Sequence, residues 1–425
     1  METKVDFPKY IIENFSNELD KKFMEITDIF TKSMLKVRET YSFNIYSKGL
    51  ALKEVEHDIN DFISKYEIKK YKNNQRLFEY DVPFSLIGEW RELITQKRTA
   101  TISDKSNSEA LFTLTHSRFE SIIEKLLDVY YKTFPNANTK KIENFTLENL
   151  KEFSSILEIG QYFHEQMVSQ KIHEPKKKLF LWMKDKVGLD IDKKEYQLFE
   201  LLYGMRNCIV HHDSIFDSRT AKLSKSWIKG NQFLVTSDIF YENWDCLFRL
   251  GHNMIISIWN NMGKSESIFY LSSKHYMNWT EYIDSSSMLN IVQYLLYSKM
   301  KRNVDDEIAL KLHYCQMLKE IEENYLEILD EIEWTTKSEK YLIIKYGILD
   351  DIDRVFECMK GFKKNSTIEF SRQKIPLKLL LGFPYFNGVI DSPRFFNIYN
   401  EIFGKKAYKD FIINFQTGND LSYLN

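Results

Sequence analysis

Apolar side chains recur every three or four positions along most of the chain, which is the spacing of helices that bury one face. The segment at residues 10–100 has one such face, formed by Phe23, Ile26, Phe30, Met34 and Val37. Two longer faces follow, formed by Phe119, Ile122, Ile123, Leu126, Leu127 and Tyr130, and by Trp244, Leu247, Phe248, Leu250, Met254, Ile255 and Ile258. The same spacing predicts helices at about 147–170, 196–212 and 241–262. Long helices joined by short connections predict an all-α fold built on a helical bundle.

Breaks in this spacing suggest how the chain is divided. The polar stretch at 101–109 lacks periodicity and predicts a linker or long loop. A β-prone stretch at 233–239 precedes the helix at 241–262. We therefore expect an N-terminal helical region at 1–105, a central domain at 106–265 and a C-terminal helical domain at 266–425.

The C-terminal region predicts two further helices. Residues 319–334 combine Ile and Leu with many Glu, which predicts an amphipathic helix with an acidic face. Near the end, Ser392 and Pro393 precede an apolar helical pattern that Gly404 follows. Ser as the cap, Pro in the first turn and Gly after the last turn are typical helix boundaries. By elimination, this region would regulate the protein or recognise a trigger.

Composition supports a helical fold and excludes several classes of protein. The 425 residues include only 14 Gly and 7 Pro, too few for a turn-rich β architecture. The 59 basic and 61 acidic residues give a net charge of -2, which excludes a protein that coats nucleic acid through an overall basic field. The four cysteines form no Cys-x-x-Cys pair, so we expect buried thiols, no metal site and no cofactor. No signal peptide or membrane-length apolar run is evident, so we expect a cytoplasmic protein with no membrane partner.

Candidate chemistry concentrates at the end of the helix predicted at 196–212. On an ideal helix with Arg206 at 0°, Asn207 lies at about 100° and His211 at about 140°. Glu200 falls near 120° on the same polar face, whereas His212 falls near 240°, so we expect it to pack or to cap the helix end. The apolar arc, at about 220° to 320°, contains Leu198, Leu201, Leu202, Met205 and Ile209. Asn207 and His211 should therefore share one face, with the long Arg206 side chain beside it.

This trio is suited to cutting RNA without a metal, because RNA carries its own nucleophile in the ribose 2′-OH. His can exchange protons near neutral pH, and Arg can bind phosphate oxygens through a planar, permanently charged group. Asn can fix a histidine tautomer or bind the phosphate. The expected products are 2′,3′-cyclic phosphate and 5′-OH ends, and DNA should resist cleavage.

The sequence Arg206-Asn207-Cys208-Ile209-Val210-His211 resembles the Arg-Asn-x-x-x-His hallmark of the HEPN superfamily. The stretch at 115–131 is similar to the first helix of that family, and the resemblance covers about 110–265. It implies a HEPN-like ribonuclease domain at 106–265 with Arg206, Asn207 and His211 as catalytic residues. It also implies a homodimer that brings two such sites into one cleft. Abortive-infection proteins and toxins contain such domains, so it further implies a growth-arresting anti-phage or toxin effector, with an antitoxin or defence-system protein as a possible partner.

Residues around the trio are candidates for RNA binding and support. The stretch at 218–230 has no acidic residue and contains Arg219, Lys222, Lys225, Trp227 and Lys229, a combination that can bind a phosphate backbone and stack a base. Residues 176–178 form a second basic cluster, Lys-Lys-Lys. Either group can equally be a solvated surface. The candidates that would orient the site are Glu120, Glu200, His212 and Asp213, for which ordinary surface roles remain the alternative.

Two other functions remain open. The first is a non-catalytic HEPN domain that binds RNA or a nucleotide. The second is a helical scaffold in which Arg206, Asn207 and His211 form a dimer interface.

Overall fold

The computed structural model describes residues 18–72, 78–134, 153–189, 191–262, 285–297, 303–334, 339–364, 366–370, 373–381, 384–390, 392–404 and 407. The fold is all-α with two short antiparallel hairpins, β1–β2 and β3–β4. The chain forms two compact units. The bundle unit comprises residues 26–184 and 190–251, and the C-terminal unit comprises residues 1–25, 185–189 and 252–425.

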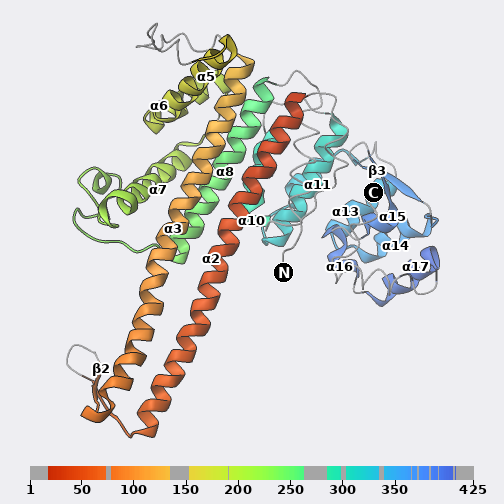
Figure 1. The fold of residues 1–425 in the computed structure, drawn as a ribbon. Helices are drawn as coiled ribbons and strands as arrows, with labels where there is room; N and C mark the ends of the chain where they lie inside the picture. Colours follow the sequence, from red (N-terminus) through yellow and green to blue (C-terminus); the bar gives the residue numbers. More distant parts are fainter. Residues whose placement is uncertain are drawn as a thin grey trace. The chain divides into compact units, whose positions relative to one another are not determined.

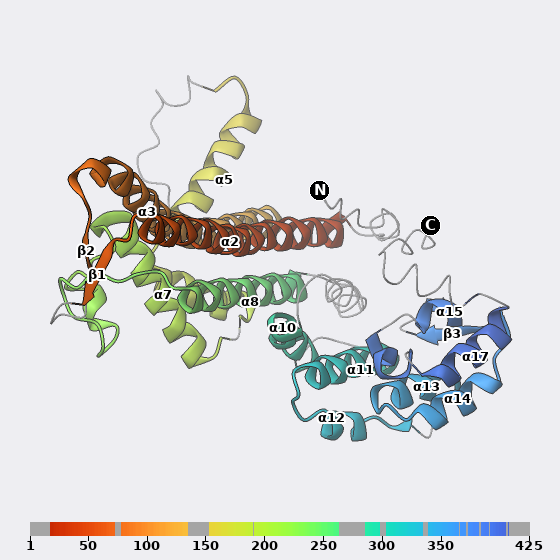
Figure 2. The ribbon, with the colours of Figure 1, turned by 90° about the horizontal axis from the view of Figure 1, so that it is seen from below.

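Three long helices run side by side: α2 (Glu18–Lys65), α3 (Ile87–Thr133) and α8 (Ser237–Met262) (Figure 1). The bundle unit contains α3, α2 from Ile26 onward and α8 up to Gly251. They also run side by side in the perpendicular view of Figure 2. Every residue of the three predicted apolar faces is buried, so these predictions are confirmed. The Trp244 indole on α8 donates a hydrogen bond of 2.8 Å to the Met34 carbonyl on α2. A methyl group at Gly251 would overlap the Phe30 ring, which shows how closely α8 approaches α2.

The predicted linker at 101–109 is wrong, because α3 continues unbroken from Ile87 to Thr133. The expected boundary between residues 105 and 106 therefore falls inside a helix. Ser108 is buried, and Lys105 lies 3.7 Å from Glu109 one turn away. Packing of one face and this ion pair compensate for the low helix propensity of Ser, Asn and Asp. The connection between α2 and α3 instead contains β1 (Lys69–Lys72), β2 (Phe78–Asp81) and the short helix η1 (Phe84–Leu86).

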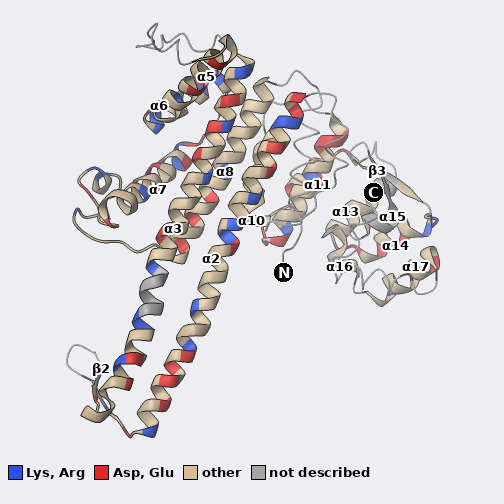
Figure 3. Cartoon of the chain, in the orientation of Figure 1, with Lys and Arg blue, Asp and Glu red and all other residues tan. Residues whose placement is uncertain are grey.

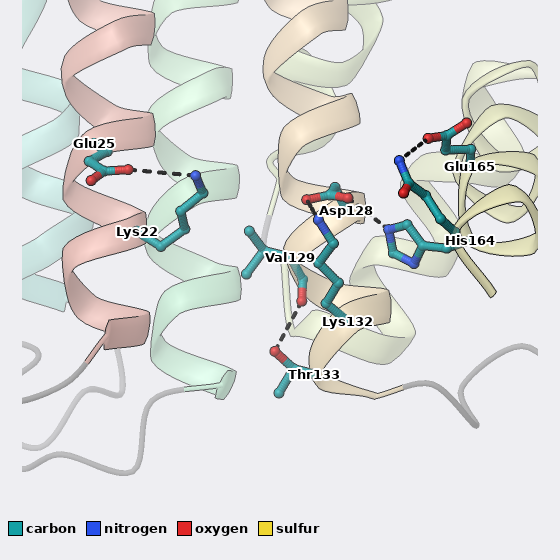
Figure 4. Close-up of polar contacts among 9 residues, drawn as sticks. Lys22, Glu25, Asp128, Val129, Lys132, Thr133, His164 and Glu165 are labelled. Carbon is teal, nitrogen blue, oxygen red and sulfur yellow. Dashed lines mark hydrogen bonds and ion pairs between the residues drawn. The ribbon is translucent and has the colours of Figure 1, made fainter. Parts of the chain in front are cut away.

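Shorter helices follow α3 in the chain: α5 (Ile156–Ile172), α6 (Lys176–Val187), α7 (Lys193–His212) and η3 (Thr220–Lys222). Helices α5 and α7 pack against α3, and η3 packs against α7. Helix α5 begins later than the predicted 147–170, and residues 147–152 lie outside the described residues. Its side chain His164 lies 2.7 Å from Asp128 of α3, which also accepts a hydrogen bond from Lys132 (Figure 4). This contact ties α5 to α3.

The predicted β-prone stretch at 233–239 forms no strand. Gln232 makes an isolated bridge to Ile215, and α8 begins at Ser237. Asp238 in the first turn of α8 interacts favourably with the helix dipole. This start lengthens the helix predicted at 241–262 by one turn.

The C-terminal unit has its own apolar core. Its elements are α10 (Ser285–Tyr297), α11 (Val304–Glu320), α12 (Leu326–Asp330), α13 (Glu339–Ile348), α14 (Ile352–Lys360), β3 (Thr367–Phe370), β4 (Gln373–Pro376), α15 (Leu377–Leu380), η5 (Pro384–Phe386), α16 (Asn387–Ile390) and α17 (Pro393–Phe403). The predicted helix at 319–334 is wrong, because α11 ends at Glu320 and Glu322 has a positive φ of 60°. The predicted boundaries of α17 are confirmed, with Pro393 in its first turn and Gly404 after its last residue, although the Ser392 side chain makes no capping hydrogen bond.

The surface charge is mixed. Acidic and basic residues both occur along α2 and along the described part of α3 (Figure 3). The thiols of Cys208, Cys246 and Cys315 are buried, as expected, whereas Cys358 is only half-buried. None of the described helices combines the length and the apolar character needed to cross a membrane.

Candidate functional site

Helix α7 presents the candidate trio. It extends from Lys193 to His212, which confirms the helix predicted there. Its buried face consists of Phe199, Leu202, Gly204, Met205 and Cys208. On the remaining surface, Arg206 and Asn207 are half-buried and His211 is exposed. The trio therefore runs from the edge of the core to solvent along the last two turns of α7.

Arg206 lies between Asn207 and helix α3. Its Nη1 donates a hydrogen bond of 3.1 Å to Asn207 Oδ1, and its Nη2 lies 3.9 Å from Glu120 Oε2. The guanidinium carbon also lies 5.8 Å from the centre of the Tyr203 ring. Arg206 thus reaches across to Asn207, as expected, while α3 supplies its countercharge.

Glu120 joins α3, α6 and α7. Its Oε1 lies 3.0 Å from Lys176 Nζ and accepts a hydrogen bond of 3.3 Å from the Tyr203 hydroxyl. Burial, followed by the charge of Glu120, raises the pKa of Tyr203 to about 12, so this hydroxyl remains a donor near neutral pH. The prediction of Glu120 as a supporting residue is consistent with this position. Sequence analysis identified Lys176 only as part of a basic cluster and did not predict that it contacts Glu120.

A buried histidine packs behind this cluster. His116 of α3 has no exposed surface, and its ring lies 5.4 Å from Phe112 and 5.8 Å from Tyr203. Burial, and then the positive charge of Arg206, lower the pKa of His116 to about 3, although the nearby Asn243 amide opposes the shift. His116 is therefore neutral near pH 7. The sequence could have indicated that His116 is buried, because it lies between Phe112 and Phe119 on the apolar face of α3.

His211 has a different environment from Arg206. Five residues separate them, which corresponds to about 7.5 Å along the helix axis and about 140° around it. Within the described part of the chain, the His211 imidazole makes no hydrogen bond or ion pair, and its ring lies 6.4 Å from that of His212. The structure therefore brings Arg206 and Asn207 together, and leaves the His211 imidazole open to solvent on the outer face.

The other proposed supporting residues have local contacts. Glu200 accepts a hydrogen bond of 3.0 Å from Tyr196 one turn earlier in α7. His212 is exposed and lies 3.7 Å from Asp217, so the expectation that it packs against the core is wrong, whereas its place at the helix end is confirmed. Asp213 follows α7 with φ 49° and ψ 43°, the left-handed conformation that ends a helix.

The segment at 213–236, which we call the basic loop, packs against the bundle. Ser214 is buried and donates a hydrogen bond of 2.5 Å to Glu109 of α3. Asp217 accepts backbone hydrogen bonds from Arg219 and Thr220. The four cations of the loop, Arg219, Lys222, Lys225 and Lys229, are all exposed. The loop therefore presents its cations to solvent from a fixed backbone.

The sequence suggested that Trp227 could stack on an RNA base, but its ring already stacks within the loop. Its ring stacks on Phe216 at 4.6 Å with an angle of 14° between the planes. Phe216 in turn stacks on Phe233 at 4.8 Å. One face of Trp227 is therefore covered by the loop's own core.

Large apolar side chains are exposed around the end of α7. They come from α7 and the basic loop, and are Val210, Ile215, Leu223, Ile228 and Leu234, with exposed fractions from 38% to 62%. We call this set the apolar patch. It adjoins His211 in the sequence at Val210, so the exposed imidazole and the patch share the same end of the helix.

Comparisons with protein-family models, with curated proteins and with solved structures give no match. Among the residues that the structure describes, no three His, Cys, Asp or Glu side chains gather as a metal-binding group. The chemistry of the cluster on α3, α6 and α7 is therefore the basis for a functional proposal.

Proposed function

We propose that this protein is a metal-independent endoribonuclease of the HEPN type, with Arg206, Asn207 and His211 as its catalytic residues. The observation that carries the proposal is the hydrogen bond between Arg206 and Asn207, one turn before the exposed His211. A fixed guanidinium and, further along the same helix, an accessible imidazole are the two kinds of group that RNA cleavage requires, for charge stabilisation and for proton transfer. The exposed cations of the basic loop support binding of a polyanion.

The proposed reaction uses the RNA ribose as the nucleophile. A neutral His211 imidazole takes the proton of the 2′-OH as the 2′ oxygen forms its bond to phosphorus. The bond from phosphorus to the 5′ oxygen breaks, and an imidazolium donates a proton to that leaving oxygen. Arg206 binds the phosphate oxygens, and Asn207 orients its guanidinium through the 3.1 Å hydrogen bond. The products are a 2′,3′-cyclic phosphate and a 5′-OH.

One chain supplies one exposed imidazole of the trio, whereas this reaction needs a base and an acid. A two-fold dimer supplies the second group, because each copy contributes the same surface. The exposed apolar side chains of α7 and the basic loop support this arrangement, since exposed apolar surface favours burial against a partner. We therefore propose that a second copy binds over the patch and places its His211 opposite the first.

The biological setting rests on the HEPN resemblance. We propose a growth-arresting anti-phage or toxin effector in the cytoplasm, held inactive by an antitoxin or defence-system protein. The C-terminal unit is a folded body with its own core, which suits a regulatory or recognition role. Inducible expression in a bacterial host tests the setting, with growth arrest expected for wild type and normal growth for His211→Ala.

The decisive experiment sequences RNA 5′-OH ends in cells that express wild type, Arg206→Ala or His211→Ala. We expect new 5′-OH ends with wild type and their loss, by about 100-fold or more, in both variants. His212→Ala is the matched control, because it removes the adjacent exposed imidazole, and it should retain cleavage. Purified protein should also cut RNA, and not DNA of the same sequence, in the presence of EDTA.

Two other results of these experiments would support the alternative functions, an RNA-binding domain or a helical scaffold. Wild-type protein that binds RNA without producing 5′-OH ends would be a non-catalytic binding domain. Loss of the dimer in light scattering together with loss of helix content in His211→Ala would indicate a scaffold. A wild-type monomer with full activity would contradict the shared active site.

A further inference from the structure

We propose that Lys176 is a second phosphate-binding cation of this site, and that Glu120 holds Lys176 and Arg206 in place until a phosphate binds both cations in its stead. This inference rests on the proposed function, because it assigns residues to the same RNA site. The assigned ligand is one phosphodiester group of RNA, bound between helices α6 and α7.

The contacts of Glu120 carry the argument. Its Oε1 lies 3.0 Å from Lys176 Nζ, and its Oε2 lies 3.9 Å from Arg206 Nη2. Each oxygen of one carboxylate therefore faces a different cation. The two non-bridging oxygens of a phosphodiester have the same charge and the same bidentate character, so a phosphate can interact with the same two cations.

The balance of charge in the cluster favours an added anion. Two cations, Lys176 and Arg206, face one carboxylate, while Tyr203 contributes a neutral hydroxyl. His116, buried behind them, adds no charge near neutral pH. The cluster therefore has one positive charge in excess, in surroundings where the cationic side chains are only 14% and 20% exposed. Partial burial strengthens attraction to a phosphate relative to a fully solvated lysine.

The longer of the two contacts, between Arg206 and Glu120, indicates where a phosphate of RNA would bind first. At 3.9 Å, the guanidinium of Arg206 is within ion-pair range of Glu120 and beyond hydrogen-bond range. Arg206 Nη2 can therefore donate to an entering phosphate, and Lys176 can follow by exchanging one oxygen partner for another.

The neighbours of Lys176 on α6 provide internal controls. Lys177 and Lys178 are exposed, and neither forms an ion pair within the described residues, whereas Lys176 is directed to Glu120. A surface that attracts RNA through general basicity would use all three lysines equally. A built site would depend on Lys176 alone.

The test measures how salt weakens binding of a single-stranded RNA whose riboses are 2′-O-methylated, so that it cannot be cleaved. Fluorescence anisotropy with full-length wild type, Lys176→Met, Lys177→Met and Lys178→Met gives the slope of log affinity against log salt. Loss of one phosphate contact should reduce this slope by about 0.7 for Lys176→Met. Lys177→Met and Lys178→Met should keep the wild-type slope, and Lys176→Arg should restore it.

Glu120→Gln tests this exchange of the carboxylate for a phosphate with an isosteric change. Removing its negative charge should tighten binding of the same RNA by about five-fold, because the carboxylate then no longer competes with phosphate for two cations. Circular dichroism should show unchanged helix content in every variant used.

The proposal is overturned if Lys176→Met has the same slope as wild type, or if all three lysine variants lose affinity equally. It is also overturned if wild type does not bind the RNA. If only the nuclease proposal is wrong, the result differs. The salt dependence of binding is then still reduced by Lys176→Met, but the wild-type protein does not cleave unmodified RNA.

Discussion

Trp227 stacks on Phe216 with ring centres 4.6 Å apart, so the basic loop is fastened by an aromatic pair within itself. Phe216 is buried, whereas the cations on either side of Trp227 are exposed. The tryptophan therefore acts first as a structural anchor for the loop.

Replacement of Trp227 by Ala should loosen the loop rather than abolish a base contact. We expect a loss of stability of about 2 kcal/mol, the sum of an aromatic pair and part of a buried ring. Hydrogen exchange should accelerate within 213–236 and remain unchanged in α8. Trp227→Phe retains the stack and should retain most of the protection. If Trp227→Ala weakens RNA binding while leaving exchange in the loop unchanged, the ring binds a base directly.

The turn after α7 depends on backbone conformation at Asp213. Asp213 and Ser214 have φ values of 49° and 62°, both in the left-handed region. Asp213→Gly should leave stability unchanged or raise it by about 0.5 kcal/mol, and Asp213→Val should lower it by about 1–2 kcal/mol. Urea denaturation of the two variants measures the difference. Equal destabilisation by both substitutions would instead indicate that the Asp213 carboxylate itself has a role.

Acid should destabilise the protein through His116. Its pKa is about 3 in the folded chain, against an ordinary value of 6.5. Below pH 6.5 the unfolded chain binds a proton that the folded chain does not, so stability is complete above pH 6.5 and falls as the pH decreases toward 3. Between pH 6.5 and 5, this one residue should account for a loss of about 2 kcal/mol.

A variant isolates this contribution. His116→Leu replaces the neutral ring with an apolar group, and should reduce the loss of stability between pH 6.5 and 5 by about 2 kcal/mol. Urea denaturation at both pH values measures the change. His57→Leu is the control, because the His57 side chain is 72% exposed. His313 of the C-terminal unit, whose pKa burial lowers to about 4, contributes a similar dependence that both variants retain.

In the C-terminal unit, a buried hydrogen bond of 2.7 Å joins the Trp259 indole to Asp20. Trp259→Phe preserves the stack on Phe23, at 5.7 Å, and leaves the carboxylate without its donor. We expect a loss of about 2–3 kcal/mol, since an unsatisfied buried charged group is costly. The double variant Asp20→Leu/Trp259→Phe should be more stable than Trp259→Phe alone in thermal denaturation. A double variant that is less stable would show that Asp20 has other essential contacts.

Helices with long apolar faces could be predicted from the sequence, and the continuity of α3 could not. Periodicity identifies the buried positions of α2, α3 and α8 because three or four apolar residues per two turns leave little ambiguity. The stretch at 101–109 contains Ser, Asp and Asn, whose local preference is against helix. Burial of Ser108 and the pairing of Lys105 with Glu109 decide its conformation, and both depend on the folded state.

The sequence predicted those parts of the candidate site whose residues lie close together on helix α7. The contact of Arg206 with Asn207 and the exposure of His211 follow from one helix wheel. Lys176 and His116 were not assigned, because each meets α7 from a separate helix and one sequence gives no direct sign of such contacts. Of the two alternatives for His212, the place at the helix end holds and packing against the core does not, because the helix ends there and the side chain stays exposed.

Helix α3 contributes Glu109 to the basic loop, His116 and Glu120 to the cluster at Arg206, and Asp128 to helix α5. These four side chains share one unbroken axis, so their mutual register is set by the number of residues between them. Inserting or deleting a single residue between Glu109 and Asp128 would rotate the anchors on one side by about 100° relative to the others. A change in the length of that interval should therefore be tolerated less well than substitutions at its exposed positions.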